Sequence, residues 1–193
     1  MESKKKATER LSPEDRKAKR TEFETTLAKS QEDLDRELIT REDVMFDYAK
    51  FLKDQDRDHF EAEKVFREIL EKIGAPSRKL EIYLEILQMT IHQLNTQSVK
   101  TDIETCKKIL EEGGDWEKKN KLKVFEGVYL MMARDFKKAA QLFLDSIATF
   151  TCSELIPYET FVFYTVISAI VTLDRGTIRK KVLHSPDILQ SID

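Results

Sequence analysis

The sequence contains few of the residues that build tight turns, disulfide frameworks or metal sites. Its 193 residues include only five glycines, four prolines, two cysteines and three histidines. β architectures with many turns need frequent glycine and proline, and small secreted scaffolds need several paired cysteines, so both classes are disfavoured. The scarcity of helix breakers instead favours long helices, in one module that is either compact or an elongated repeat array.

The charge balance and the apolar runs disfavour two further classes. The 33 basic and 36 acidic residues give a net charge of −3, so no global positive field attracts nucleic acid or anionic lipid. The basic run Arg16–Arg20 suggests nucleic-acid contact, but acids surround it, and a solvated helix face is the preferred interpretation. No stretch approaches the roughly 20 apolar residues of a membrane span, and no secretory signal follows the first lysines. We therefore predict a soluble intracellular protein without membrane or nucleic-acid partners.

Apolar residues recur with the helical period in successive segments that short polar connections separate. Two helices are predicted within each of the segments 40–73, 77–114 and 115–147, and each short connection predicts an antiparallel hairpin. Residues 158–173 predict a further helix. Part of that segment is rich in β-branched and aromatic residues, which also suit a strand, but the length of the apolar pattern favours a helix. Residues 174–193 predict one or two shorter helices.

A densely charged segment precedes the hairpins. Ser12 supplies a capping hydroxyl and Pro13 suits a first helical position, so a helix is expected to start there. Its narrow stripe of apolar residues continues to Leu38. This pattern suits a long helix that packs through one narrow face against this chain or another. We therefore divide the chain into a charged N-terminal helix at 1–38, with a flexible start, and a helical-repeat domain at 40–193.

Two junctions predict how helices end. Gly74 followed by Pro76 is the usual combination of a left-handed cap and a residue that cannot extend a helix. The Gly-Gly-Asp sequence at 113–115 predicts a second stop and a new N-cap. Trp116, the only tryptophan, comes next, and we expect its indole to be buried in the wedge between consecutive hairpins. An exposed contact with a neighbouring subunit is the competing interpretation.

Helix pairs recur at intervals of roughly 35 to 40 residues, as expected when each unit must stack on its neighbour to bury its apolar face. Gly127, Ala139 and Phe143 have the spacing of the tetratricopeptide pattern, in which a small residue lets two helices approach and an aromatic fills the gap. Ala62 and Phe66 repeat the later part of this pattern. We predict an all-α, tetratricopeptide-like solenoid of antiparallel helix hairpins, with a plain helical bundle as the alternative.

Residues with catalytic or metal-binding chemistry are scattered. His59, His92 and His184 lie on separate segments, and Cys106 and Cys152 lie in apolar settings that predict buried free thiols. The glycines form no phosphate-binding loop or nucleophile elbow, and the adjacent acids suit solvated faces. We assign no catalytic, cofactor-binding or metal-binding residue. The sequence predicts a protein that is not an enzyme and that needs no cofactor or small-molecule ligand.

The string Ile109–Asn120, ILEEGGDWEKKN, resembles the family of non-ATPase regulatory subunit 6 of the 26S proteasome, a subunit of the regulatory particle lid. The resemblance continues through 133–140, 145–151, 153–155 and 158–161, is looser at 172–189, and is weak but collinear from Thr40. It implies a right-handed helical-repeat arm, which in the family precedes a PCI domain that contains a winged helix. A paralogous signalosome subunit shares this architecture.

The resemblance also implies a function. Members of this family are non-catalytic scaffold subunits that bind other lid subunits and support ubiquitin-dependent protein degradation, in the cytoplasm and the nucleus. A signalosome-like PCI-complex subunit and a free-standing tetratricopeptide-like adaptor are the alternatives. The adaptor would grip an acidic tail with regularly spaced Lys, Asn and Arg, and no such register is apparent. The chain ends at Asp193, where the family continues into the PCI domain, so a fragment or a truncated paralogue is expected.

Overall fold

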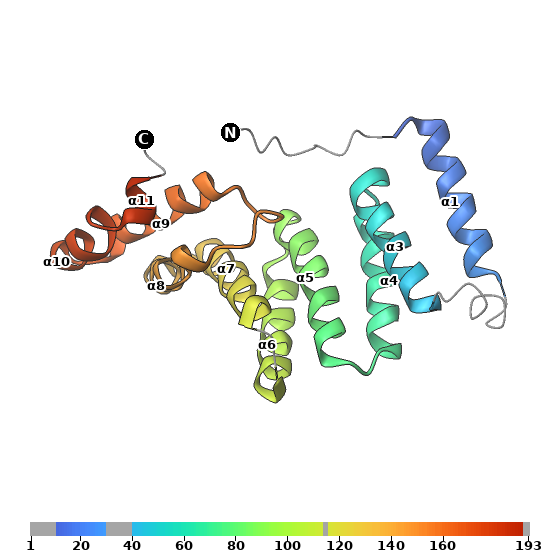
Figure 1. The fold of residues 1–193 in the computed structure, drawn as a ribbon, viewed down its shortest axis with the longest axis horizontal. Coiled ribbons are helices and arrows are strands. Elements are labelled where there is room, and N and C mark those ends of the chain that lie inside the picture. The colour runs from blue at the N-terminus through green and yellow to red at the C-terminus, as the bar shows by residue number, and fades with distance from the viewer. Residues whose placement is uncertain (1–10, 30–39, 114–115, 191–193) are drawn as a thin grey trace. The chain divides into compact units, whose positions relative to one another are not determined.

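The protein is all-α. The computed structural model describes residues 11–29, 40–113 and 116–190, and none of these residues is in a strand (Figure 1). The main helices are α1 (Pro13–Leu27), α3 (Arg41–Phe51), α4 (His59–Lys72), α5 (Pro76–His92), α6 (Thr96–Gly113), α7 (Trp116–Met132), α8 (Phe136–Ser146) and α9 (Tyr158–Thr172). The shorter ones are a π-helical turn (Leu52–Asp56), a 3-10 turn (Ile147–Thr149), α10 (Arg175–Ile178), a second π-helical turn (Arg179–Leu183) and α11 (Pro186–Leu189). The predicted all-α class is confirmed, and the segment that also suited a strand is the helix α9.

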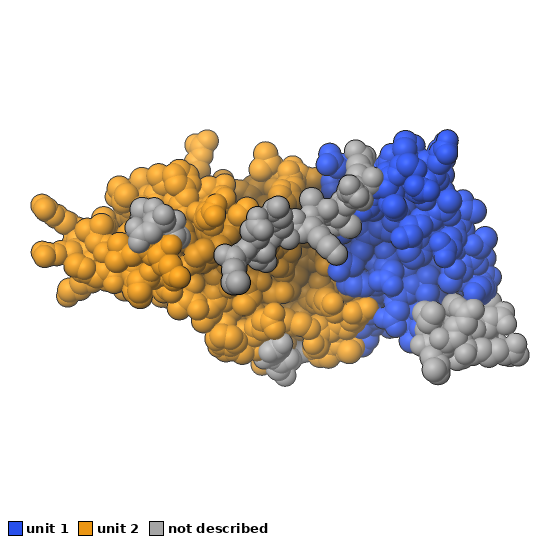
Figure 2. Space-filling model, turned by 45° about the horizontal axis from the view of Figure 1, so that its top comes forward, with its two compact units in different colours: residues 1–74 blue, residues 75–193 orange. Residues whose placement is uncertain are grey.

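The chain divides into two compact units, residues 1–74 and 75–193 (Figure 2). Unit 1 contains α1, α3 and α4, and unit 2 contains α5 to α11. The division into a charged N-terminal helix at 1–38 and a helical-repeat domain at 40–193 stays a prediction.

In unit 1, the charged helix α1 rests on α3 of the same chain. The ring of Phe23 lies 5.6 Å, between centroids, from the rings of both Tyr48 and Phe51. Beside this aromatic contact, the guanidinium of Arg20 forms an ion pair with Glu61 of α4. One aromatic contact and several ion pairs of the α1 arginines therefore hold a helix that buries none of its own side chains completely.

The helix α1 is shorter than the sequence predicted. It ends at Leu27, and the predicted continuation to Leu38 falls mostly outside the described residues. The hydroxyls of Thr21, Thr25 and Thr26 donate hydrogen bonds at 2.7 to 3.0 Å to backbone carbonyls one turn earlier. β-branched residues that hydrogen-bond to their own backbone lower helix propensity, and three of them lie in the last two turns of α1.

The three hairpins share one type of turn. Each turn has a residue with φ near 60° followed by an Asp or Asn that caps the next helix: Arg57–Asp58, Leu94–Asn95 and Arg134–Asp135. In the second and third turns, paired backbone hydrogen bonds complete a Schellman motif, with Asn95 N to Thr90 O at 3.1 Å and Asp135 N to Leu130 O at 2.8 Å. The same turn thus recurs in successive helix pairs, as a repeat requires.

The junction after α4 differs from its prediction. The helix ends at Lys72, Ile73 is extended with φ −84° and ψ 130°, and Gly74 is not left-handed either. The predicted left-handed cap is therefore wrong. Ala75 is extended as well, because the ring of Pro76 disfavours helical backbone at the residue before it. At the next predicted stop, α6 ends at Gly113, while the last two residues of the Gly-Gly-Asp sequence lie outside the described residues.

In unit 2, consecutive helices pack as antiparallel neighbours. Helix α5 contacts both its own partner α6 and the first helix of the next pair, α7, and α8 then packs between α7 and α9 (Figure 1). Gly127 of α7 faces the ring of Phe143, and a Cβ added to this glycine would lie only 2.7 Å from Phe143 Cδ1. The predicted close approach of these two helices is confirmed. A right-handed superhelical path of the whole chain stays a prediction.

Candidate interaction surfaces

The three histidines are on separate elements. His59 is the first residue of α4, His92 is the last residue of α5, and His184 follows the second π-helical turn. Within the described residues, no group of three His, Cys, Asp or Glu side chains could hold a metal ion. The assignment of no catalytic, cofactor-binding or metal-binding residue stays a prediction.

Both cysteines are buried free thiols, as the sequence predicted. Cys106 is on α6, and Cys152 is in the connection between the 3-10 turn and α9. Burial, together with the nearby carboxylate of Asp102, raises the pKa of Cys106 from 9.0 to about 12. Burial and the carboxylate of Glu154 raise the pKa of Cys152 to about 12 as well. Since the thiolate is the nucleophile, these two side chains are unreactive at neutral pH.

One face of α9 exposes apolar side chains in a continuous row. We call the four residues of this row the α9 stripe: Phe163, Ile167, Ile170 and Val171. Phe163 is 60% exposed and Ile170 is 58% exposed, and their spacing places the row on one side of the helix. An exposed apolar row on a protein surface marks a place where a partner packs. None of the described helices is long and apolar enough to cross a membrane.

The opposite face of α9 is in the core of unit 2. Phe161 is buried there, with its ring 5.2 Å from that of Phe143 and stacked 4.6 Å from that of Phe150. The sequence contained a signal for this arrangement, because a helix that is apolar on all sides needs neighbours on all sides. The apolar pattern predicted the helix but not which of its faces is uncovered.

Trp116 is exposed, so the prediction of a buried indole is wrong. It retains 64% of its accessible surface, and the side chains of α7 become buried only from Asn120 onwards. Trp116 is the first residue of the helix and precedes its first buried side chain by one turn. The competing interpretation, an exposed aromatic available to a partner, fits the structure.

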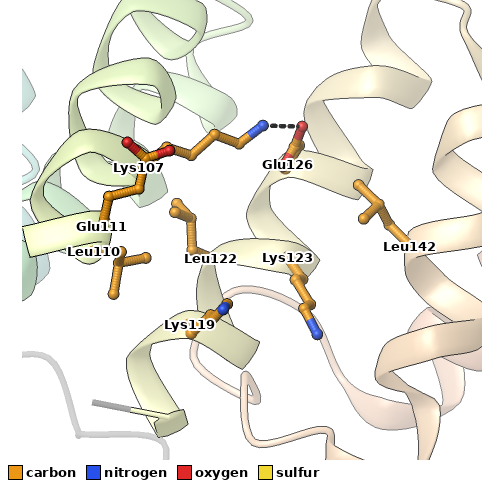
Figure 3. A pocket seen from close by; sticks show the side chains of 8 residues that line it. All are labelled: Lys107, Leu110, Glu111, Lys119, Leu122, Lys123, Glu126 and Leu142. Atoms are coloured by element: carbon orange, nitrogen blue, oxygen red, sulfur yellow. Dashed lines mark hydrogen bonds and ion pairs between the residues drawn. The ribbon is translucent and has the colours of Figure 1, made fainter. Parts of the chain in front are cut away.

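A pocket of about 530 Å³ opens between α6, α7 and α8 (Figure 3). It is lined by Lys107, Leu110 and Glu111 of α6, by Lys119, Leu122, Lys123 and Glu126 of α7, and by Leu142 of α8. One end is closed by an ion pair in which Lys107 Nζ lies 2.6 Å from Glu126 Oε1. This pocket was not predictable from the sequence because its walls come from three helices. The only feature of the sequence that pointed to the pocket was a pair of lysines one helical turn apart on α7.

Comparison with known proteins gives one consistent family. The model of the family described as 26S proteasome subunit RPN7 matches residues 4–181. The 26S proteasome non-ATPase regulatory subunit 6 homolog of Arabidopsis thaliana is 51% identical over 118 residues, which are 61% of this chain and 30% of the relative. The 26S proteasome regulatory subunit RPN7 of Saccharomyces cerevisiae is 35% identical over 137 residues, 71% of this chain and 32% of the relative. The matched part of the chain thus spans about a third of the length of these curated relatives.

Proposed function

Because the chain belongs to the 26S proteasome subunit RPN7 family, we propose that it is a non-catalytic scaffold subunit of the lid of the proteasome regulatory particle. In this role it supports ubiquitin-dependent protein degradation by binding other lid subunits, in the cytoplasm and the nucleus. The observation that carries the proposal is the family match, which extends across residues 4–181 and therefore through both compact units.

The surface of unit 2 supports a scaffold role. A scaffold subunit needs helix faces that a neighbouring subunit covers, and such faces are rich in aromatic and apolar side chains at their centres. The α9 stripe and Trp116 have this character, because large apolar side chains are exposed there although other parts of the same helices are buried. We propose that a lid subunit packs on the α9 stripe.

The separation of the histidines and the burial of the cysteines support the proposal that the chain is not catalytic. Among the described residues, the histidines lie on separate elements and both thiols are buried and protonated at neutral pH. Enzymes bring a nucleophile, a base and an orienting group within hydrogen-bond reach of one another. We infer that the protein has no hydrolytic activity and requires neither a cofactor nor a small-molecule ligand.

Affinity purification of the tagged full chain from cells tests the proposal. We expect lid subunits to be recovered with the chain in near-stoichiometric amounts. Recovery of signalosome subunits instead would indicate that the chain belongs to the paralogous complex. Recovery of neither would reject the scaffold role.

A paired substitution tests the α9 stripe. The double variant Phe163→Ser/Ile170→Ser removes two exposed apolar side chains, so we expect it to keep its circular dichroism spectrum and lose the lid subunits. Phe60→Ser is the matched control, because Phe60 is 84% exposed but stands outside the stripe, on α4. Equal recovery with the wild type, the control and the double variant would show that lid subunits bind elsewhere on the chain.

A further inference from the structure

Positive charge is concentrated at one end of the pocket between α6, α7 and α8. Lys119 and Lys123 are one turn apart on α7, so their Cβ atoms are about 6 Å apart on the same face of the helix. Within the part of the chain that the structure describes, neither lysine forms an ion pair.

The acidic residues of the pocket lie toward its other end. Glu126 is paired with Lys107, and the side chain of Glu111 extends along α6 toward Lys107 and away from Lys119 and Lys123 (Figure 3). This separation leaves one end with two lysines and another end where two carboxylates accompany a single lysine. A ligand that binds along the pocket would therefore carry its negative charge at the end of Lys119 and Lys123.

An apolar wall joins the two ends. Leu110 of α6, Leu122 of α7 and Leu142 of α8 contribute to it (Figure 3). Ligand sites of several hundred Å³ usually combine such a wall with a few charged groups that fix orientation. An inorganic anion or the phosphates of a nucleic acid would leave the leucines uncovered, so neither fits the pocket as a whole.

We propose that this pocket binds a short acidic peptide segment of a partner protein, with two carboxylates on Lys119 and Lys123 and an apolar side chain against the leucines. In an extended peptide, alternate side chains on one face are about 6.6 Å apart, which matches the spacing of the two lysines. Trp116, which is exposed, lies one turn before Lys119 on α7. This inference goes beyond the proposed scaffold role, because it assigns a ligand class to a site that the role does not require.

Fluorescence anisotropy with the isolated full chain tests the proposal without any proteasome component, so its outcome is independent of the scaffold role. The probe is a fluorescein-labelled peptide of alternating glutamate and leucine. We expect saturable binding that weakens as salt rises. The variant Lys119→Gln/Lys123→Gln should bind about fivefold to tenfold more weakly, the loss expected for two solvent-exposed charge pairs.

Two controls distinguish binding of the peptide in the pocket from nonspecific attraction between opposite charges. The variant Lys108→Gln/Lys137→Gln changes two exposed lysines outside the pocket and should bind like the wild type. A peptide of alternating glutamate and serine keeps the charge but lacks the apolar side chains, and should bind more weakly than the leucine peptide. No binding of the leucine peptide, equal binding by all variants, or equal binding of both peptides would each overturn the proposal.

Discussion

Trp116 extends from the first turn of α7 with most of its ring in solvent. Tryptophan brings a large apolar area with few rotatable bonds, and it is enriched among the residues that contribute most to binding at protein interfaces. Nothing in the sequence separated this role from a buried one, because the cap-like residues before Trp116 fit either arrangement. The side chains of α7 are buried only from Asn120 onwards, which depends on how α7 packs against other helices. This packing leaves Trp116 exposed.

Trp116→Ala is expected to leave stability nearly unchanged, because an exposed side chain contributes little to the folded state. The free energy of unfolding should change by less than about 0.5 kcal/mol, and the wild-type tryptophan emission should be that of a solvated indole. Thermal melts and emission spectra of the isolated chain measure both quantities. Blue-shifted emission together with a markedly lower melting temperature in the variant would contradict the structure.

The two buried thiols predict a loss of stability at alkaline pH. Burial raises the pKa of Cys106 and of Cys152 from 9.0 to about 12, so the folded protein retains protons that the unfolded chain releases. Their contribution is fully present below about pH 9 and is lost as the pH rises toward about 12. Burial also raises the pKa of Tyr48 and of Tyr158, which adds to the same trend.

Urea unfolding at several pH values measures this effect. The free energy of unfolding should fall between about pH 9 and about pH 10.5, and it should fall less in the variant Cys106→Ala/Cys152→Ala. The variant retains both tyrosines, so the difference between the two curves isolates the cysteines. Identical pH dependence in the wild type and the variant would show that the thiols titrate normally in the folded protein.

At the scale of elements, the contact between α7 and α8 depends on a missing side chain. Gly127 leaves room for the ring of Phe143, which is itself buried against Phe161 and cannot move aside. The sequence predicted this contact correctly, because the residue spacing matched a known pattern of small and aromatic residues. The left-handed turns were not predictable in the same way. Leu94 and Arg134 are not glycines, and backbone hydrogen bonds of the hairpin hold them in that conformation.

Gly127→Ala is expected to destabilise unit 2, because the new methyl group would overlap the Phe143 ring. The clash should cost about 1 to 3 kcal/mol, although alanine is about 1 kcal/mol better than glycine within a helix. Chemical denaturation of the full chain measures the change. Gly74→Ala is the matched control and should be close to neutral, because no atom lies within 4 Å of an added Cβ there.

The double variant Gly127→Ala/Phe143→Leu tests whether the clash is the cause. The smaller leucine makes room for the methyl group, so the two substitutions together should cost less than the sum of their separate effects. Additive costs would mean that the loss in Gly127→Ala arises elsewhere, and that the close approach of α7 and α8 is not what requires glycine.

At the scale of the whole molecule, the assignment rests on a family match that runs through both compact units. Helix periodicity predicted the all-α class and the hairpins, because each hairpin carries its own apolar pattern and its own cap. The specific string around Ile109–Asn120 predicted the family. The pocket between α6, α7 and α8 and the uncovered α9 stripe were not predicted, because each depends on which helices meet in three dimensions.

Sedimentation of a cell extract through a density gradient tests the central claim, that this chain is a scaffold subunit of the proteasome lid, most directly. If the claim is correct, the endogenous chain sediments with lid subunits in a large complex, and an antibody against a lid subunit depletes it from those fractions. If the chain remains at the top of the gradient, as expected for a free protein, and is not depleted, the claim is contradicted.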